Sequence, residues 1–367
     1  MTTDKLCRWG ILGAANIARK NWDAIRHAEN ATLVAVASRS QPRAEEYIRE
    51  CQLVAPHEQT PTASTYEELL ARKDIDAVYI PLPTGIRKEW VIKAANAGKH
   101  VLCEKPCAPT VAELEEMLAA CRKNKVQFMD GVMFMHSDRL PLMRRALDES
   151  GKVGPIKRIA SHFSFLAPPE FMASNIRASS DLEPLGALGD LGWYNTRFTL
   201  WATNYQLPTH VTGRILTAGK RPDSSLDVPL EFSAEMWFPG GVSASYYCSF
   251  VTQIQQWANI SGTEGYLHVD DFVLSSFGCE AAFELTVSNL DRSGCIYNMP
   301  QRTERIASPE YSNNHPTAQE TGLFRRFSNI VVTGRLEPQW ETIALATQKV
   351  VNACLESARN DGRRISL

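Results

Sequence analysis

Three residues with complementary chemistry lie within one short segment, GALGDLGWYNTR, which runs from Gly186 to Arg197. Asp190, Tyr194 and Arg197 supply a carboxylate, a phenol and a guanidinium at positions i, i+4 and i+7. A continuous helix over this segment would place the three side chains on one face. Such a face is either one wall of an active site or a polar surface in contact with water, and the rest of the chain must decide.

A second pair of candidate residues lies in VLCEKPC, residues 101–107. Glu104 and Lys105 follow a short apolar run that reads as a parallel strand, and ligands bind at the carboxyl ends of such strands. Pro106 restricts the backbone of Lys105, and a cis peptide bond there would turn the ammonium inward. For this motif alone, a solvated Glu–Lys pair is the alternative interpretation.

The first predicted strand is followed by a turn that suits a dinucleotide. Gly13, Ala15 and Ala18 match the pattern G-x-G-x-x-G/A between a strand and a helix, and Asn16 and Ile17 fall at the start of that helix. The glycine permits the tight turn, and the helix N-terminus can hold a pyrophosphate. Ala15 carries a methyl group where glycine is usual, so a tight packing turn is the alternative.

The second predicted strand ends in Ser38-Arg39, and Arg43 follows one helical turn later. A free ribose 2′-hydroxyl prefers a carboxylate at this position, whereas a guanidinium suits a 2′-phosphate. The residues therefore predict NADP rather than NAD as cofactor. NAD remains possible if the arginines only face water.

The elements that must position these residues change in character along the chain. In the first 130 residues, apolar strands alternate with helices, which is typical of a parallel sheet covered on both faces. After about residue 150, strands with alternating polarity indicate an antiparallel sheet, and Pro239-Gly240-Gly241 marks a hairpin between 230–238 and 242–250. Residues 304–320 read as a long surface loop, and residues 337–361 as an amphipathic helix.

This pattern predicts the fold class and the domains. We expect an α/β N-terminal Rossmann domain with a parallel sheet over residues 1–130. An α+β C-terminal domain over residues 131–367, with an open, mainly antiparallel sheet, would bind substrate and support oligomerisation. Its C-terminal helix can pack back on the first domain.

Composition excludes several other classes of protein. The 367 residues carry a formal net charge of −2, which argues against binding to nucleic acid or to an anionic membrane. Neither an apolar run of membrane-spanning length nor a secretory signal is visible. Nine scattered cysteines without a CxxC motif indicate reduced thiols in the cytoplasm and no metal site.

Taken together, the motifs resemble the glucose-fructose oxidoreductase/inositol dehydrogenase/rhizopine catabolism (Gfo/Idh/MocA) family over nearly the whole chain. The resemblance is carried by the dinucleotide turn, by EKP at 104–106, by GALGDLGWY at 186–194 and by SGTEGYLHV at 261–269. The sequence of these motifs is most similar to the branch with dimeric dihydrodiol dehydrogenase, NADP-dependent D-xylose dehydrogenase and their plant homologues. It implies that Lys105, Asp190 and Tyr194 are catalytic.

The chemistry of these three residues agrees with that implication. Hydride transfer to a carbonyl builds negative charge on its oxygen, so a proton donor must lie within hydrogen-bonding reach. The pKa of free tyrosine is ~10, and a nearby ammonium lowers it. We therefore expect Tyr194 to act as acid or base, Lys105 to orient the substrate oxygen and tune the phenol, and Asp190 to hold the ammonium or a substrate hydroxyl.

Further residues are expected around the substrate and the nicotinamide. The loop of Pro81, Leu82 and Thr84 follows a parallel strand, and we expect it to meet the cofactor together with Glu104 and Lys105. Many relatives carry a histidine three residues after this threonine, where this chain has Arg87, which suggests an anionic or more polar ligand.

For three other substrate candidates the sequence leaves alternatives open. Arg177 lies on the segment that leads to Asp190. Arg197 either contacts substrate or braces a domain interface, and His136 either faces a cleft or is structural. Trp9 and Trp193 are expected to be packing residues.

The sequence thus predicts an NADP-dependent oxidoreductase that acts on a secondary alcohol or ketone of a sugar, polyol or cyclic diol. A homodimer through the open sheet is expected from the resemblance and from the need to cover that face. Two alternatives are a glycosidase-type enzyme that retains its cofactor for transient oxidation, and a non-catalytic nucleotide-sensing regulator.

Overall fold

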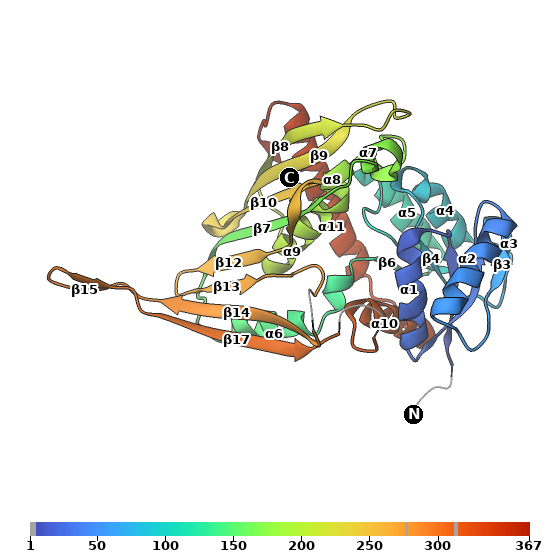
Figure 1. The fold of residues 1–367 in the computed structure, drawn as a ribbon, viewed down its shortest axis with the longest axis horizontal. Coiled ribbons are helices and arrows are strands. Elements are labelled where there is room, and N and C mark those ends of the chain that lie inside the picture. Colours follow the sequence, from blue (N-terminus) through green and yellow to red (C-terminus); the bar gives the residue numbers. More distant parts are fainter. Residues whose placement is uncertain (1–4, 276–277, 312–314) are drawn as a thin grey trace. The chain divides into compact units, whose positions relative to one another are not determined.

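The computed structural model describes residues 5–275, 278–311 and 315–367, which form two compact units (Figure 1). The first unit comprises the described residues of Met1–His136, Asp181–Pro184 and Asn313–Gln348. The second comprises those of Ser137–Ser180, Leu185–Ser312 and Lys349–Leu367. The predicted boundary between functional domains at residues 130 and 131 stays a prediction, because compactness does not assign binding roles.

The first unit contains a parallel six-stranded sheet in the order β3-β2-β1-β4-β5-β6, the arrangement of a dinucleotide-binding fold. The predicted α/β Rossmann class is therefore confirmed for this part of the chain. The strands are β1 (Cys7–Leu12), β2 (Ala31–Ala37), β3 (Thr62–Ser64), β4 (Ala77–Ile80), β5 (His100–Cys103) and β6 (Phe128–Asp130). The helices that connect them are α1 (Asn16–His27), α2 (Gln41–Val54), α3 (Tyr66–Ala71), α4 (Thr84–Asn96) and α5 (Val111–Lys123).

The first unit also uses a helix from far along the sequence. Trp9 of β1 is completely buried, and its ring contacts Phe324 and Phe327 of α10 (Gln319–Thr333) at centroid distances of 4.9 and 5.1 Å. The indole N–H donates to Ser328 Oγ at 2.9 Å. Packing of α10 on the first strand explains why the described residues of Asn313–Gln348 belong to this unit, and the division falls inside α11 (Gln339–Arg359).

The second unit is built on one broad sheet in the order β17-β14-β13-β12-β7-β10-β9-β8-β18, with β11 paired to β7. Only the pair β7–β10 is parallel in the described part of this sheet, so the predicted mainly antiparallel class is confirmed. The strands are β7 (Ile156–Leu166), β8 (His210–Gly219), β9 (Val228–Trp237), β10 (Ser243–Ser249), β11 (Val251–Gln255), β12 (Ala258–Gly262), β13 (Tyr266–Val269), β14 (Glu280–Ser288), β17 (Gln301–Pro309) and β18 (Ile365–Ser366), with the small pair β15 (Asp291–Ser293) and β16 (Ile296–Asn298) beyond β14.

The predicted hairpin between β9 and β10 is confirmed. Its turn uses Gly240 and Gly241, whose φ angles of 75° and 79° lie in the left-handed region that favours glycine.

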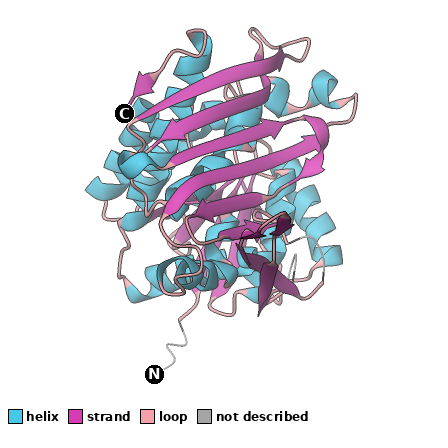
Figure 2. Cartoon of the chain, turned by 90° about the vertical axis from the view of Figure 1, so that its left-hand side faces the viewer, coloured by secondary structure: helices cyan, strands magenta, loops and turns pink. Residues whose placement is uncertain are grey.

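Helices cover one face of the sheet and leave the other open. Helices α8 (Gly186–Asp190) and α9 (Gly192–Ala202) contact β7, β9 and β10, and every residue of α9 is buried. Figure 2 shows the opposite face, on which no helix of the described chain is layered. Two further helices of the second unit are α6 (Arg139–Asp148), which contacts β14 and β17, and the short α7 (Phe171–Ser174), which contacts the segment before α8.

The prediction of a long surface loop over 304–320 is wrong. Its first part belongs to β17, which pairs with β14 along nine residues, and α10 begins at Gln319. The strand was missed because most of its side chains are polar and almost all are exposed, so backbone hydrogen bonds hold it without a continuous apolar face. Residues 312–314 of the predicted loop lie outside the described residues.

Gly186, at the start of α8, provides a test of the packing between α8 and β9. Its φ is +50°, and a Cβ would lie 2.2 Å from the carbonyl oxygen of Pro229. We expect Gly186→Ala to lower the free energy of unfolding by about 2–4 kcal/mol, because it adds a clash with backbone to the cost of a left-handed alanine. Urea unfolding followed by circular dichroism measures this loss.

Gly151→Ala is the matched control in the same unit. Gly151 also has a positive φ, +66°, but nothing lies within 4 Å of its Cβ position. It should lose only about 1 kcal/mol. Equal losses for the two variants would show that the contact with Pro229 does not constrain α8.

Candidate functional site

The turn after β1 is closely packed against the loop after β4. Gly13 has φ of +140°, and a Cβ there would lie 3.1 Å from Leu82 Cδ2 and 3.5 Å from Pro81 Cγ. Strands β1 and β4 are neighbours whose connections run to opposite sides of the sheet, and this switch point is where doubly wound folds bind nucleotides. The predicted cofactor residues Gly13, Pro81 and Leu82 are thus brought together.

The N-terminus of α1 has the properties of an anion site. Ala15 is the N-cap in extended conformation, no described side chain caps the helix, and the first turn has no acidic residue. Asn16 and Ile17 are exposed. The first amide N–H groups and the positive end of the helix dipole are therefore available to a pyrophosphate, as the predicted roles of these residues require.

One hydroxyl and two guanidinium groups follow the end of β2, those of Ser38, Arg39 and Arg43, the last in the first turn of α2. Ser38 is buried, Arg39 is exposed, and Arg43 Nη2 lies 3.5 Å from the carbonyl oxygen of Ala14 in the glycine turn. Of the predicted 2′-phosphate residues, Arg43 thus lies next to the turn.

Sequence reasoning missed Tyr66 at this place. Burial raises the pKa of the Tyr66 phenol, and the nearby charges of Arg39 and Arg43 oppose that rise. The sequence could have indicated this position, because Thr65 and Glu68 form a capping box that starts α3 directly after β3. This helix start places Tyr66 at the carboxyl edge of the sheet.

The segment of Glu104 and Lys105 is fixed by a buried hydrogen-bond network. Tyr79 Oη donates to Glu104 Oε1 at 2.6 Å, and the backbone N–H of Lys105 donates to Glu104 Oε2 at 3.1 Å. Complete burial and the adjacent carboxylate raise the pKa of Tyr79 well above its usual value, so its phenol remains a donor. The peptide bond between Lys105 and Pro106 is cis, as the sequence suggested.

The guanidinium of Arg87 binds backbone carbonyl oxygens of the protein itself. Its side chain is buried, with 3% of the residue exposed, and its guanidinium donates to the carbonyl oxygens of Leu82, Glu104 and Pro106. Nε lies 3.0 Å from the oxygen of Leu82, and Nη1 lies 2.8 Å from that of Glu104. The predicted substrate contact is not supported by this arrangement, which instead ties two loops together.

Thr84, a predicted cofactor residue, lies where the segment Asp181–Pro184 meets α4. Its N–H donates to Glu183 Oε1 at 3.0 Å, its hydroxyl donates to Oε2 at 2.5 Å, and the N–H of Gly85 donates to Leu182 O at 2.8 Å. A Cβ on Gly85 would lie 2.0 Å from Asp181 O, so only glycine fits there. This helix terminus is therefore satisfied by the chain itself, in contrast to that of α1.

The expectation of one helix carrying Asp190, Tyr194 and Arg197 is wrong. Helix α8 ends at Asp190 and α9 begins at Gly192, with Leu191 between them at φ −106° and ψ −45°. The junction is closely packed, since a Cβ on Gly192 would lie 3.0 Å from Leu188 Cδ1 and 3.2 Å from Cys248 Sγ.

The carboxylate of Asp190 is held by an arginine from the segment before α8. Arg177 Nε donates to Asp190 Oδ2 at 2.7 Å, and the side chain of Asp190 is only 12% exposed while that of Arg177 is 38% exposed. The roles predicted for both residues toward substrate stay predictions.

Tyr194 lies on α9 with 6% of its surface exposed, and its ring meets Phe163 of β7 edge-on at 5.6 Å. The neighbouring Asn195 donates to Ser161 Oγ at 2.9 Å, which fixes the helix against the same strand. The phenol is thus carried by a rigid element, as acid–base chemistry requires.

For the remaining candidates the packing favours structural roles. Arg197 is completely buried in α9, and His136 stacks on Trp340 with ring centroids 5.0 Å apart. Trp9 and Trp193 are completely buried, in agreement with their predicted packing roles. The substrate contacts predicted for Arg197 and His136 stay predictions.

The described residues contain no group of three or more histidine, cysteine, aspartate or glutamate side chains placed to hold a metal ion. They also contain no helix with the length and apolar character needed to cross a membrane.

Comparison with known proteins agrees with the architecture. Residues 7–132 match the model of the oxidoreductase family with an NAD-binding Rossmann fold, Gfo/Idh/MocA, and residues 142–268 match a Gfo/Idh/MocA C-terminal domain. The chain belongs to the Gfo/Idh/MocA oxidoreductase family. It is therefore an enzyme of the dehydrogenase/reductase class with a nicotinamide dinucleotide-binding domain, as predicted.

Two of the relatives carry names from the predicted branch. D-xylose 1-dehydrogenase (NADP(+)) 2 of Haloferax volcanii is 33% identical over 264 residues, which are 71% of this chain and 75% of that protein. Trans-1,2-dihydrobenzene-1,2-diol dehydrogenase of Bos taurus is 28% identical over a match that covers 72% of this chain and 74% of that protein. The crystal structure of a 3-ketoreductase from Actinomadura kijaniata in complex with NADP and TDP-benzene matches with 25% sequence identity and a TM-score of 0.79. The match covers 96% of this chain and 98% of the ketoreductase.

Proposed function

We propose that the chain is an NADP-dependent oxidoreductase that transfers hydride between the nicotinamide and a secondary alcohol or ketone of a sugar, polyol or cyclic diol. The observation that carries this proposal is the set of loops after β1, β4 and β5, which gathers a glycine turn, an open helix N-terminus and Lys105 at one edge of the sheet. Named relatives act on a sugar and on a cyclic diol, which supports the substrate class.

The residues at this edge fit a dinucleotide. Gly13 leaves the backbone bare beside Leu82, and the uncapped amides of Asn16 and Ile17 supply donors for phosphate oxygens. When bound, the nicotinamide supplies or accepts the hydride.

The cofactor form follows from the end of β2. Arg39 and Arg43 bring two guanidinium groups to the place where a 2′-phosphate would lie, and no carboxylate stands between Ser38 and Arg43 to accept a ribose 2′-hydroxyl. A relative that is NADP-dependent by name and a similar structure that holds NADP support the same choice.

We propose that Tyr194 exchanges the proton with the substrate oxygen and that Lys105 orients this oxygen and lowers the pKa of the phenol. In reduction, the Tyr194 hydroxyl gives its proton as negative charge grows on the oxygen, and in oxidation the phenolate takes a proton from the alcohol. Asp190, fixed by Arg177, would accept a hydrogen bond from a substrate hydroxyl or from the Lys105 ammonium.

Removal of either catalytic group tests the mechanism. We expect Tyr194→Phe and Lys105→Met each to lower kcat by roughly a hundred-fold or more, because each removes a group needed at the reacting oxygen. A screen of aldoses, polyols and dihydrodiols with NADP and with NAD, followed by the absorbance of the reduced nicotinamide, supplies the substrate for the measurement.

Lys88→Met is the control, since Lys88 lies on the surface of α4, where it pairs with Glu116 at 3.1 Å and with no other carboxylate of the described residues. It should keep the kcat of the wild type. Wild-type kcat in Tyr194→Phe or in Lys105→Met would refute the assignment, and copurified cofactor without net redox turnover would point to the transient-oxidation alternative.

The cofactor preference has its own test in Arg39→Ala. Loss of the charge should raise the KM for NADP by about ten-fold or more and leave the KM for NAD nearly unchanged, because only NADP carries the 2′-phosphate. Arg49→Ala, at an exposed site of α2 paired with Glu46, is the matched control. An equal change of both KM values would contradict the proposed role.

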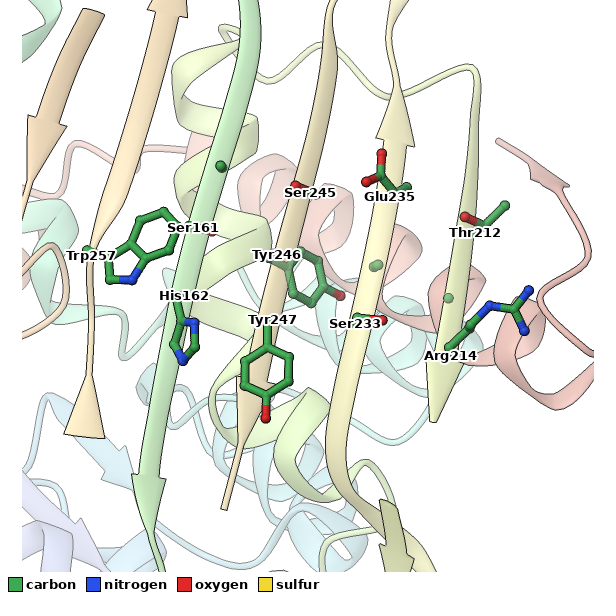
Figure 3. Close-up of a pocket in the computed structure, with 13 residues that line it drawn as sticks. Ser161, His162, Thr212, Arg214, Ser233, Glu235, Ser245, Tyr246, Tyr247 and Trp257 are labelled. Atoms are coloured by element: carbon green, nitrogen blue, oxygen red, sulfur yellow. The ribbon is translucent and has the colours of Figure 1, made fainter. Parts of the chain in front are cut away.

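We also propose that two copies associate through the open face of the sheet in the second unit. A hollow of about 300 Å³ lies on this face, lined among others by His162, Tyr247 and Trp257 (Figure 3). The ring of His162 lies 4.7 Å from that of Tyr247 and 5.8 Å from that of Trp257, on the side of β7 opposite to Ser161, which contacts α9. Half-buried aromatic side chains on an uncovered sheet are typical of an interface between copies.

A charge placed in this face should separate the copies. In sedimentation velocity at micromolar concentration, we expect the wild type and the control Leu53→Asp, on α2 of the first unit, to be dimers. Tyr247→Asp should be a monomer, because an unpaired carboxylate is costly to bury. A monomeric wild type, or a dimeric Tyr247→Asp, would rule this interface out.

The free cysteines support a reducing compartment, and we propose the cytoplasm. Seven of the nine thiols are buried, and burial raises the pKa of Cys7 and of Cys354 to about 12, which keeps both protonated and unreactive.

A further inference from the structure

Arg87 is a buried cation whose hydrogen bonds all go to backbone carbonyls. Its guanidinium reaches Leu82 O in the loop after β4 and both Glu104 O and Pro106 O in the loop after β5. Among the described residues, no carboxylate lies within ion-pair distance of it. A charge that is buried in this way must be stabilised by the carbonyl dipoles around it.

The carbonyls that Arg87 binds flank Lys105. Glu104 comes directly before the lysine and Pro106 directly after it, so the backbone on both sides of Lys105 is anchored to one group. The N–H of Lys105 itself is anchored separately, by the carboxylate of Glu104. Rotation of the segment around Lys105 would break bonds to Arg87, which is expensive inside the protein.

The same guanidinium connects Lys105 to the glycine turn. Leu82, whose carbonyl accepts from Nε and Nη2 of Arg87, contacts the position of a Cβ on Gly13 at 3.1 Å. A shift of the loop after β4 would therefore be transmitted to Lys105 through Arg87. The five donors of a planar guanidinium allow this bridging of two loops, whereas the two ring nitrogens of a histidine could not serve three carbonyls.

We infer that Arg87 is a positioning residue, which fixes the backbone of Lys105 relative to the loop that packs on the dinucleotide turn. This inference rests on the proposed catalytic role of Lys105. It assigns the arginine no contact with substrate and no proton transfer, and it makes the rate of hydride transfer depend on a buried side chain.

The test compares Arg87→Met with Lys99→Met. Lys99 is the matched control because it is also buried in the first unit, with its ammonium bound to the carbonyl oxygens of Arg72 and Ile75, away from Lys105. We expect Arg87→Met to lower kcat by about ten- to a hundred-fold, since small misplacements of a catalytic group carry such a cost. Lys99→Met should keep kcat within two-fold or so, although both variants lose stability.

Two further readouts separate positioning from general destabilisation. Hydrogen exchange of a peptide covering residues 101–108 should become faster in Arg87→Met and stay unchanged in Lys99→Met. In a Lys105→Met background, Arg87→Met should lower kcat by no more than about three-fold, because the group that it positions is already absent.

The inference fails if Arg87→Met keeps the kcat of the wild type, if exchange at 101–108 is unchanged, or if the loss of kcat is the same with and without Lys105. Should Arg87→Met not fold, Arg87→Lys replaces it, and the same dependence on Lys105 is required of it. Wild-type kcat in Lys105→Met alone would instead overturn the proposed catalytic role, so the two failures are distinguishable.

Discussion

A buried guanidinium surrounded by carbonyl oxygens is the interaction on which the nucleotide-binding edge of this protein depends. The loops after β4 and β5 are short and leave polar backbone groups inside the fold, and Arg87 satisfies the carbonyls of both. Because unsatisfied buried carbonyls are costly, the loops are held at one separation. Gly13 then lets the turn after β1 approach Leu82, which places the open end of α1 beside them.

In the second unit, glycines instead of a buried charge fix the elements that carry the candidate residues. Gly186 begins α8 and Gly192 begins α9. A methyl group on Gly186 would meet Pro229 of β9 at short distance, and one on Gly192 would meet Leu188 and Cys248 of β10. The helix is interrupted at Leu191, between Asp190 and Tyr194, so the acid and the phenol lie on separate short helices. Rigid support of both groups by β7 and by Arg177 is what the proposed proton transfer requires.

The sequence predicted the large features because they follow from burial. Parallel strands such as β4 and β5 are covered on both faces and so read as apolar runs, and the hairpin at Gly240 is set by left-handed glycines. Strand β17 could not be predicted in this way, since its exposed polar residues carry no alternation and its backbone pairing is not visible in side-chain chemistry.

At the site, the motif residues could be predicted but their supports could not. Lys105 and Gly13 stand in recognisable patterns, whereas Tyr79 reads as one more apolar core position and reveals its role only through the 2.6 Å bond to Glu104. Arg87 was expected near the substrate because it stands where many relatives carry a histidine, and its bonds to the carbonyls of two loops leave no mark in the sequence. The break at Leu191 was hidden because helical spacing continues across it.

The central claim is that Lys105 and Tyr194 act on the same oxygen atom of the substrate. A double-mutant cycle with Lys105→Met and Tyr194→Phe, measured as kcat/KM in the oxidation direction, tests it most directly. If the two groups act as one unit, the double variant should be no more than about three-fold slower than the slower single variant. Losses that multiply would mean that the two residues contribute independently, and would contradict the account.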